Sequence, residues 1–244
     1  MIRTLITFIF GAVASVVIMP PLIVWTMISG DVQLMYDVFI SALRVVLKVA
    51  GIRVRTEGLE NIPAGTCVFA SNHCSNLDPV AMVPQIPRRI SILAKTDVFK
   101  IPILSKAFRQ GGVIPVDRKN REAAADSVDQ AVESLKTGLS FVIFAEGTRS
   151  RDGRLQPFKR GAFVMAIRAG VPVVPVALAG TQKLMRKGDW KLYPGEVVVK
   201  FAPAIDATRF APEQRQQLLE QAHAAVAANL PPDQRPLEPA AREN

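Results

Sequence analysis

The chain alternates short apolar runs with longer segments whose apolar residues recur at helical spacing. Seven runs have the length of strands, and most are apolar at nearly every position. They cover residues 52–56, 66–70, 90–94, 113–116, 139–145, 171–178 and 197–201. Between them the spacing predicts helices at residues 32–49, 79–85, 98–108 (interrupted near Pro102), 120–136, 161–169 and 212–229. This alternation is typical of an α/β fold with a largely parallel central sheet covered by helices.

The longest apolar run lies at the N-terminus. No charged residue occurs from Thr4 to Ser29, and a helix of that length would measure about 39 Å, against about 30 Å for the core of a bilayer. Pro20 and Pro21 are expected to interrupt it, which leaves a first piece of about 24 Å, too short to span alone. Three interpretations stay open: a signal peptide cleaved near residues 12–14, a kinked transmembrane helix, and a hairpin that enters one leaflet and returns.

Residues 32–49 would form the second half of such a hairpin. Arg44 and Lys48 are four apart and therefore share a helix face, while apolar side chains cover the rest. An ordinary core helix would have the same pattern. We expect an N-terminal helical membrane anchor at residues 1–50, a folded domain at residues 51–230, and a disordered, proline-rich tail at residues 231–244.

Composition narrows the choice of partners. The 244 residues carry a formal net charge of +9, 49% are hydrophobic, the pI is about 9.9 and the mean hydropathy is +0.22. A basic and apolar chain favours an anionic membrane surface or a phosphorylated substrate. No nucleic-acid partner is expected, because the sequence has no recognisable binding motif and few aromatics. The two cysteines form no disulfide framework, which favours a reducing compartment.

The reactive side chain that stands out is His73, in the connection after the strand at residues 66–70. Asp78 and Pro79 follow, and we expect them to be the N-cap and first residue of a helix. His73 and Asp78 would be about 140° apart on one helix, so only a loop that folds back can bring them together. The carboxylate would then fix the imidazole tautomer and leave the other nitrogen as a general base. The chain has only one other histidine, His223, so a histidine base would be His73.

Two alternatives stand beside this interpretation. A histidine next to an aspartate is often only a structural hydrogen-bonded pair. Cys74 could instead be a covalent nucleophile beside a base, although adjacent residues of an extended segment tend to point apart.

Further short blocks follow in order, each after a strand. They are Lys95 in Ala94–Pro102, Gly112–Arg118 ending in Asp117-Arg118, Glu146-Gly147-Thr148-Arg149, and Val171-Pro172-Val173-Val174-Pro175. With the His73-x-x-x-x-Asp78 block they cover roughly residues 70–178. Taken together they resemble the motifs of the glycerolipid acyltransferases, the lysophosphatidic acid acyltransferase group.

The resemblance implies transfer of a fatty acyl group from an acyl thioester, on acyl carrier protein or coenzyme A, to the sn-2 hydroxyl of lysophosphatidic acid. His73 and Asp78 would be catalytic, and Lys95, Arg118 and Arg149 would hold the acceptor phosphate. Glu146, Gly147 and Thr148 would belong to the same binding block. A thioester is already activated, so no metal or bound cofactor is expected. Such an enzyme would lie on the cytoplasmic face of the bacterial inner membrane.

Other functions remain open at this point. The acceptor could be glycerol 3-phosphate or another lysolipid. The protein could also bind membrane lipid without catalysis, although such a protein would be expected to lack His73 or Asp78, and both are present. A serine hydrolase is disfavoured, because the chain has no Gly-x-Ser-x-Gly motif.

Overall fold

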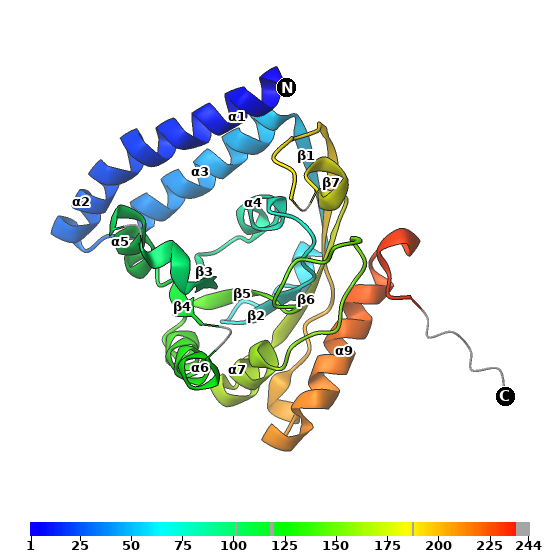
Figure 1. Ribbon diagram of the computed structural model, residues 1–244. Coiled ribbons are helices and arrows are strands. Elements are labelled where there is room, and N and C mark those ends of the chain that lie inside the picture. Colours follow the sequence, from blue (N-terminus) through cyan, green and yellow to red (C-terminus); the bar gives the residue numbers. More distant parts are fainter. Residues whose placement is uncertain (101, 118–119, 187, 238–244) are drawn as a thin grey trace.

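The central sheet is mostly parallel. The computed structural model describes residues 1–237, apart from residues 101, 118–119 and 187. Within these residues seven strands pair in the order β1-β7-β6-β2-β5-β3-β4 (Figure 1). They are Ile52–Glu57 (β1), Val68–Ser71 (β2), Ile90–Lys95 (β3), Ile114–Val116 (β4), Ser140–Phe144 (β5), Val173–Ala179 (β6) and Gly195–Phe201 (β7). Only the β6–β7 pair is antiparallel. The predicted α/β class and all seven predicted strands are confirmed.

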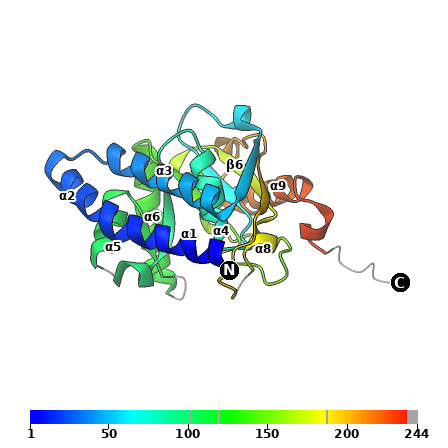
Figure 2. The same cartoon turned by 90° about the horizontal axis from the view of Figure 1, so that it is seen from above.

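Helices cover both faces of the sheet. Figures 1 and 2 show α3 and α4 on one face and α6, α7 and α9 on the other. The helices are Ile2–Val13 (α1), Met19–Ser29 (α2), Gln33–Ala50 (α3), Leu77–Met82 (α4), Pro102–Gln110 (α5), Arg121–Lys136 (α6), Gly161–Ala169 (α7), Thr181–Leu184 (α8) and Arg215–Ala228 (α9).

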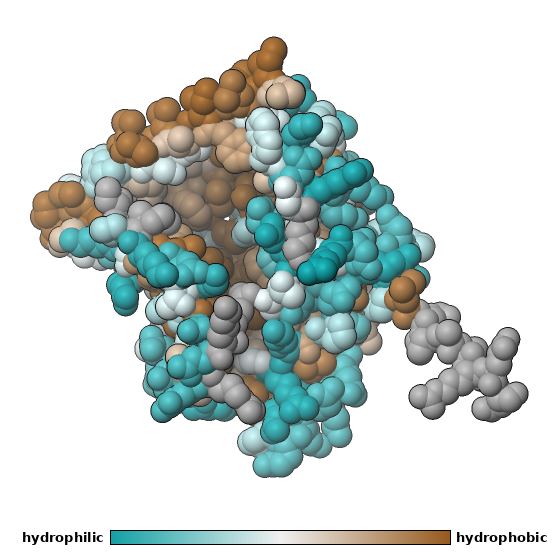
Figure 3. Space-filling view, in the orientation of Figure 1, coloured by the Kyte–Doolittle hydropathy of each residue, from teal (hydrophilic) through white to brown (hydrophobic). Residues whose placement is uncertain are grey.

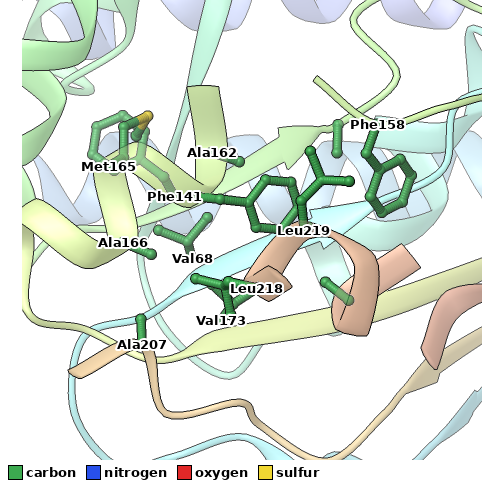
Figure 4. Close-up of a cluster of buried hydrophobic side chains, with 14 of the residues drawn as sticks. Val68, Phe141, Phe158, Ala162, Met165, Ala166, Val173, Ala207, Leu218 and Leu219 are labelled. Carbon is green, nitrogen blue, oxygen red and sulfur yellow. The ribbon is translucent and has the colours of Figure 1, made fainter. Parts of the chain in front are cut away.

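The core divides into two layers because side chains alternate along each strand. Val68 and Phe141 point to the side of α7 and α9, where they meet Leu218 (Figure 4). Phe69 points to the opposite face and meets Phe201 edge-on, with ring centroids 6.0 Å apart. The central strands β2 and β6 are therefore buried on both faces and are mostly apolar, whereas β1 and β7 alternate more buried with more exposed residues.

The N-terminal apolar run is one continuous helix of 28 residues, Ile2–Ser29. The expectation that Pro20 and Pro21 interrupt it is wrong. Directly before them, Ala14–Ile18 form a π-helical turn, in which the Met19 N–H bonds to the Ala14 carbonyl five residues back. A wider turn of this kind accommodates the proline rings and the missing N–H donors. The helix is about 42 Å long, so by length and composition it could cross a membrane.

This helix forms the outermost layer of the molecule. It packs along α3, and only 17% of its most apolar 18-residue window is buried. Figure 3 shows hydrophobic residues along the outer side of α1 and α2. The Thr4 side chain bonds to both the N–H and the carbonyl of Leu192, which ties the start of α1 to the loop before β7. The structure therefore presents a candidate membrane anchor with a fixed position on the domain.

The segment after α9 is folded onto the domain. Pro232–Gln234 form a 3₁₀ turn, and the buried Gln234 side chain accepts a hydrogen bond from the Gly180 N–H at 3.0 Å. The prediction of disorder from residue 231 is therefore wrong up to residue 237, and residues 238–244 lie outside the described part. Pro231 and Pro232, two of the prolines that suggested disorder, instead begin this turn.

Candidate active site

The sheet brings several of the predicted site residues to one edge. Strands β2, β3, β5 and β6 run parallel, so their carboxyl ends share that edge, where ligands bind in folds of this type. His73 follows β2 by two residues, Glu146 follows β5 by two, and Lys95 is the last residue of β3. Arg118, which follows β4, lies outside the described residues.

His73 and Asp78 meet because the loop between them folds back. The Nδ1 atom of His73 lies 2.7 Å from Oδ2 of Asp78. The prediction that Asp78 is the helix N-cap is wrong: α4 begins at Leu77, with Asn76 as its N-cap. The Asp78 carboxylate turns back toward the loop instead of capping the helix.

Asp78 is fully buried, and both of its carboxylate oxygens accept hydrogen bonds. Besides His73, its Oδ2 accepts from the backbone N–H groups of Cys74 at 2.7 Å and Ser75 at 2.8 Å. Its Oδ1 accepts from the Thr181 hydroxyl at 2.5 Å. Donors on both oxygens offset the cost of burying a carboxylate and fix its orientation.

The His73 ring is held in place on a second side. It stacks on the Phe144 ring, with centroids 4.3 Å apart and planes 24° from parallel. Since Asp78 can only accept, the proton belongs on Nδ1 of His73, which leaves Nε2 with a free lone pair. The side chain is 18% exposed, so the ring is partly open to solvent.

Glu146 holds the backbone of the same loop through a hydrogen bond. Its Oε1 accepts a 2.9 Å hydrogen bond from the backbone N–H of His73, and the residue is buried. Burial raises the pKa of Glu146 to about 8, although hydrogen bonds from the backbones of His73 and Gln156 oppose the shift. Its Oε2 is buried and has no partner among the described residues, which suits a carboxyl group that carries a proton. The predicted contact of Glu146 with substrate stays a prediction.

The rest of the Glu-Gly-Thr-Arg block forms a tight turn. Gly147 has φ +72°, a conformation that favours glycine. A Cβ added there would lie 2.8 Å from Cδ of Lys159, so the Lys159 side chain lies across the turn. Thr148 is exposed and Arg149 is half-buried. Lys159 is therefore a further cation near this edge, which sequence reasoning did not separate from its basic neighbours.

Lys95 lies at the predicted edge and is exposed to solvent. Its ammonium pairs with Asp97, which also pairs with Lys100 at 2.9 Å. The two lysines lower the pKa of Asp97 to about 2. Strands β2 and β3 are separated by β5, so Lys95 lies about 10 Å across the sheet from His73.

Comparison with known proteins gives the family. The sequence model of the Acyltransferase family matches residues 53–179, a span that includes His73, Asp78 and the Glu146 block. The chain belongs to this acyltransferase family.

Relatives of the acyltransferase extend the match beyond this span. They include the 1-acyl-sn-glycerol-3-phosphate acyltransferases of Limnanthes douglasii, 32% identical over 96% of this chain and 82% of that protein, and of Pseudomonas aeruginosa, 33% identical over 75% and 70%. The crystal structure of the 1-acyl-sn-glycerophosphate (LPA) acyltransferase PlsC from Thermotoga maritima superposes with a TM-score of 0.76, at 26% identity, over 93% of this chain and 95% of that one. The bacterial relatives and the apolar N-terminal helix indicate that this acyltransferase associates with a membrane.

Cys74 is poorly suited to act as a nucleophile in this acyltransferase. Its Sγ is buried, 3.3 Å from the Thr181 hydroxyl. Burial, followed by the nearby Asp78 carboxylate, raises the pKa of the thiol well above its usual range. A thiolate is the nucleophilic form, so the contacts favour the histidine base over covalent catalysis.

Three residues of the acyltransferase site were missed by sequence reasoning. Thr181 bonds to Asp78, Phe144 stacks on His73, and Asn72 exchanges hydrogen bonds of 2.8 and 2.9 Å with the backbone of Leu178. The two hydrogen bonds between Asn72 and Leu178 extend the pairing of β2 with β6 past the end of β2. A signal was present for Thr181, because it follows a strand that ends at the same edge.

Proposed function

We propose that this acyltransferase moves a fatty acyl group from an acyl thioester to the sn-2 hydroxyl of lysophosphatidic acid and so forms phosphatidic acid. The observation that carries the proposal is the His73–Asp78 pair, which orients an imidazole at the sheet edge with Nε2 left for a substrate hydroxyl. The names of the relatives support this choice of acceptor.

The reaction needs one base and one activated acyl group. Nε2 of His73 accepts the proton of the sn-2 hydroxyl while that oxygen attacks the thioester carbonyl. The tetrahedral intermediate collapses, the carbon–sulfur bond breaks, and the imidazolium returns the proton to the departing sulfur. Asp78 stabilises the imidazolium during this sequence, as the third group of a catalytic triad does. The products are phosphatidic acid (1,2-diacylglycerol 3-phosphate) and the free thiol of acyl carrier protein or coenzyme A.

Cations around the same edge hold the acceptor phosphate. We assign this role to Lys95, Arg118 and Arg149, with Gly147 and Thr148 shaping the turn that presents Arg149. A guanidinium offers a planar fork that fits phosphate oxygens. Holding the acceptor beside His73 turns a chance encounter into an oriented attack.

Glu146 acts through His73 and makes no direct contact with the acceptor. Its carboxyl group fixes the backbone of the loop that carries the base. We therefore assign it a positioning role in place of the substrate contact that the family resemblance implies.

The N-terminal helix holds the enzyme on the cytoplasmic leaflet of the bacterial inner membrane. Packing of α1 and α2 along α3 supports a monotopic anchor, because spanning in this arrangement would carry the polar side chains of α3 into the hydrocarbon core. Thr4, bonded to Leu192, argues against a cleaved leader. The acceptor and product then stay in the bilayer, while the donor arrives from the cytosol.

The proposal is tested with the purified full-length protein in liposomes. The assay combines lysophosphatidic acid, other lysophospholipids and glycerol 3-phosphate with acyl-carrier-protein and coenzyme A thioesters. We expect lysophosphatidic acid to give the highest kcat/KM. A higher value for another acceptor would reassign the substrate, and no turnover with any pair would point to a lipid-binding protein.

A further inference from the structure

A second concave site lies on the same side of the sheet as His73. The antiparallel pairing of β6 with β7 brings the starts of β7 and β1 to the edge where β2 ends. There a pocket of about 780 Å³ opens between the end of α3, the start of β1 and the start of α1. None of its lining residues belongs to the His73 site, and β1 is about 14 Å across the sheet from β2.

Among the residues that the structure describes, four cations from three elements line this pocket, and no acidic residue does. They are Arg3 of α1, Arg44 and Lys48 of α3, and Arg53 of β1. A Cβ added to Gly51 would lie 2.7 Å from a guanidinium nitrogen of Arg3, so this side chain covers the turn that joins α3 to β1. Arg44 donates to the Pro84 carbonyl at 3.0 Å.

These cations differ from their neighbours in lacking counterions. Within the described part of the chain none of the four forms an ion pair, whereas Arg55, two residues beyond Arg53, pairs with Glu57 at 3.2 Å and Glu196 at 3.7 Å. Isolated surface cations are ordinarily just solvated. Four converging cations repel one another, however, and a bound anion would relieve that repulsion.

An apolar surface continues from the cationic pocket. A neighbouring pocket of about 630 Å³ shares Arg3 and is lined otherwise by Met1, Ile2, Ile6 and Val49. Ile2 and Ile6 belong to the exposed apolar side of the candidate membrane helix. A ligand that fills both pockets therefore carries an anionic group next to an apolar chain, and it lies where the membrane surface would be.

We propose that this pair of pockets binds an anionic membrane phospholipid, with its phosphate among Arg3, Arg44, Lys48 and Arg53 and an acyl chain along α1. The site is distinct from the acceptor site and binds a lipid that is not consumed. It fixes the depth at which the start of α1 meets the headgroups. The assignment depends on the pocket and its charges and does not require the acyl-transfer reaction.

The test compares two double variants of the full-length protein in neutral detergent. Lys48→Ala/Arg53→Ala removes two pocket cations. The control, Arg55→Ala/Lys136→Ala, removes the same charge from exposed residues that are ion-paired and lie outside the pocket. Native mass spectrometry and calorimetry measure binding of dihexanoyl phosphatidylglycerol, with dihexanoyl phosphatidylcholine and inorganic phosphate as comparison ligands.

We expect the pocket variant to bind phosphatidylglycerol about tenfold or more weakly, a loss of about 1.4 kcal/mol or more, because two of the four cations around the phosphate are gone. The control should bind like the wild type. The site would be overturned if both variants lost the same affinity for phosphatidylglycerol. It would also be overturned if the wild type bound phosphatidylcholine as tightly as phosphatidylglycerol. Inorganic phosphate that binds as tightly as phosphatidylglycerol would show an adventitious anion site and overturn the lipid assignment.

Acyl transfer measured in the same variants separates this site from the proposed function. With lysophosphatidic acid varied up to saturation, the pocket variant should keep the wild-type kcat and acceptor KM. A rise in acceptor KM parallel to the loss of binding would make the pocket part of the acceptor site and overturn a separate lipid. If the wild type transfers no acyl group at all, the binding comparison still decides this proposal.

Discussion

Thr181 and Asp78 are 103 residues apart in sequence and are joined by a 2.5 Å hydrogen bond from the Thr181 hydroxyl to Oδ1 of Asp78. Both side chains are fully buried. The bond connects the first residue of α8, which follows β6, with the first turn of α4, which follows β2, so elements after two neighbouring strands fix the orienting carboxylate. Thr181 touches neither the base nor the substrate in our mechanism and is a positioning residue.

Thr181→Val should lower kcat about tenfold and leave the acceptor KM unchanged. A hydrogen bond to a charged group contributes roughly 1.5–3 kcal/mol, and its loss would loosen the carboxylate that orients His73. Thr181→Ser keeps the hydroxyl and should restore kcat. If Ser and Val are equally impaired, the methyl packing of Thr181 matters and its hydroxyl does not.

His73→Ala and Asp78→Asn should each reduce turnover by about 100- to 10,000-fold, the usual cost of losing a general base or its partner. Circular dichroism and thermal unfolding check that the variants remain folded. Cys74→Ala is the matched control in the same loop and should stay active. Near-normal turnover of folded His73→Ala, or an acyl group found on Cys74 by mass spectrometry, contradicts the direct-attack mechanism.

Arg149→Ala should raise the KM for lysophosphatidic acid much more than the KM for the acyl thioester. The guanidinium follows the Glu146 turn at the sheet edge, and its fork suits the phosphate of the acceptor. Initial rates are measured with each substrate varied in turn. A change confined to the donor KM would move Arg149 to the donor site.

Glu146→Gln should flatten the dependence of stability on pH. The folded pKa of about 8 lies above the ordinary value near 4.3, so the folded state holds a proton that the unfolded state has lost between these values. The stabilisation is therefore complete below about pH 4 and is lost as pH rises to 8, by at most about 1.4 kcal/mol per pH unit. Glutamine keeps an acceptor for the His73 N–H and does not titrate.

Urea unfolding at pH 6 and pH 9 measures this difference. The wild type should lose more stability between the two pH values than Glu146→Gln does. Glu133→Gln, at an exposed position on α6, is the control and should behave like the wild type. Identical pH dependence in the wild type and Glu146→Gln would show that Glu146 is ionised in the folded protein.

The sequence predicted the central strands well because a strand buried on both faces is mostly apolar. Val68 and Phe69, for example, pack into opposite layers and have the same character. The His73–Asp78 contact was also predicted, since their spacing allowed only a loop that folds back. Family resemblance, in turn, named the Glu146 block but not what Glu146 touches.

Other features depend on contacts that local patterns do not encode. Thr181 and Lys159 reach the site only through the tertiary fold. The place of Thr181 after a strand indicates the edge but not its contact with Asp78, and nothing distinguishes Lys159 from its basic neighbours. Pro20 and Pro21 were misjudged because a proline is expected to break a regular α-helix, whereas a π-helical turn before them lets the helix continue. Because the helix is continuous, it is no longer too short to span the membrane, and its length does not favour a hairpin. The packing of α1 and α2 on α3 remains as the support for a hairpin in one leaflet.

The orientation of this helix gives the last prediction. Ile2→Cys should resist an impermeant maleimide in intact bacterial spheroplasts and react after they are permeabilised, because a monotopic anchor keeps both ends on the cytoplasmic side. The native Cys67 and Cys74 are buried and give little background. Lys136→Cys, on the exposed surface of α6, reports the side of the catalytic domain. Labelling of Ile2→Cys in intact spheroplasts, with Lys136→Cys protected, would show that the 28-residue helix spans the membrane.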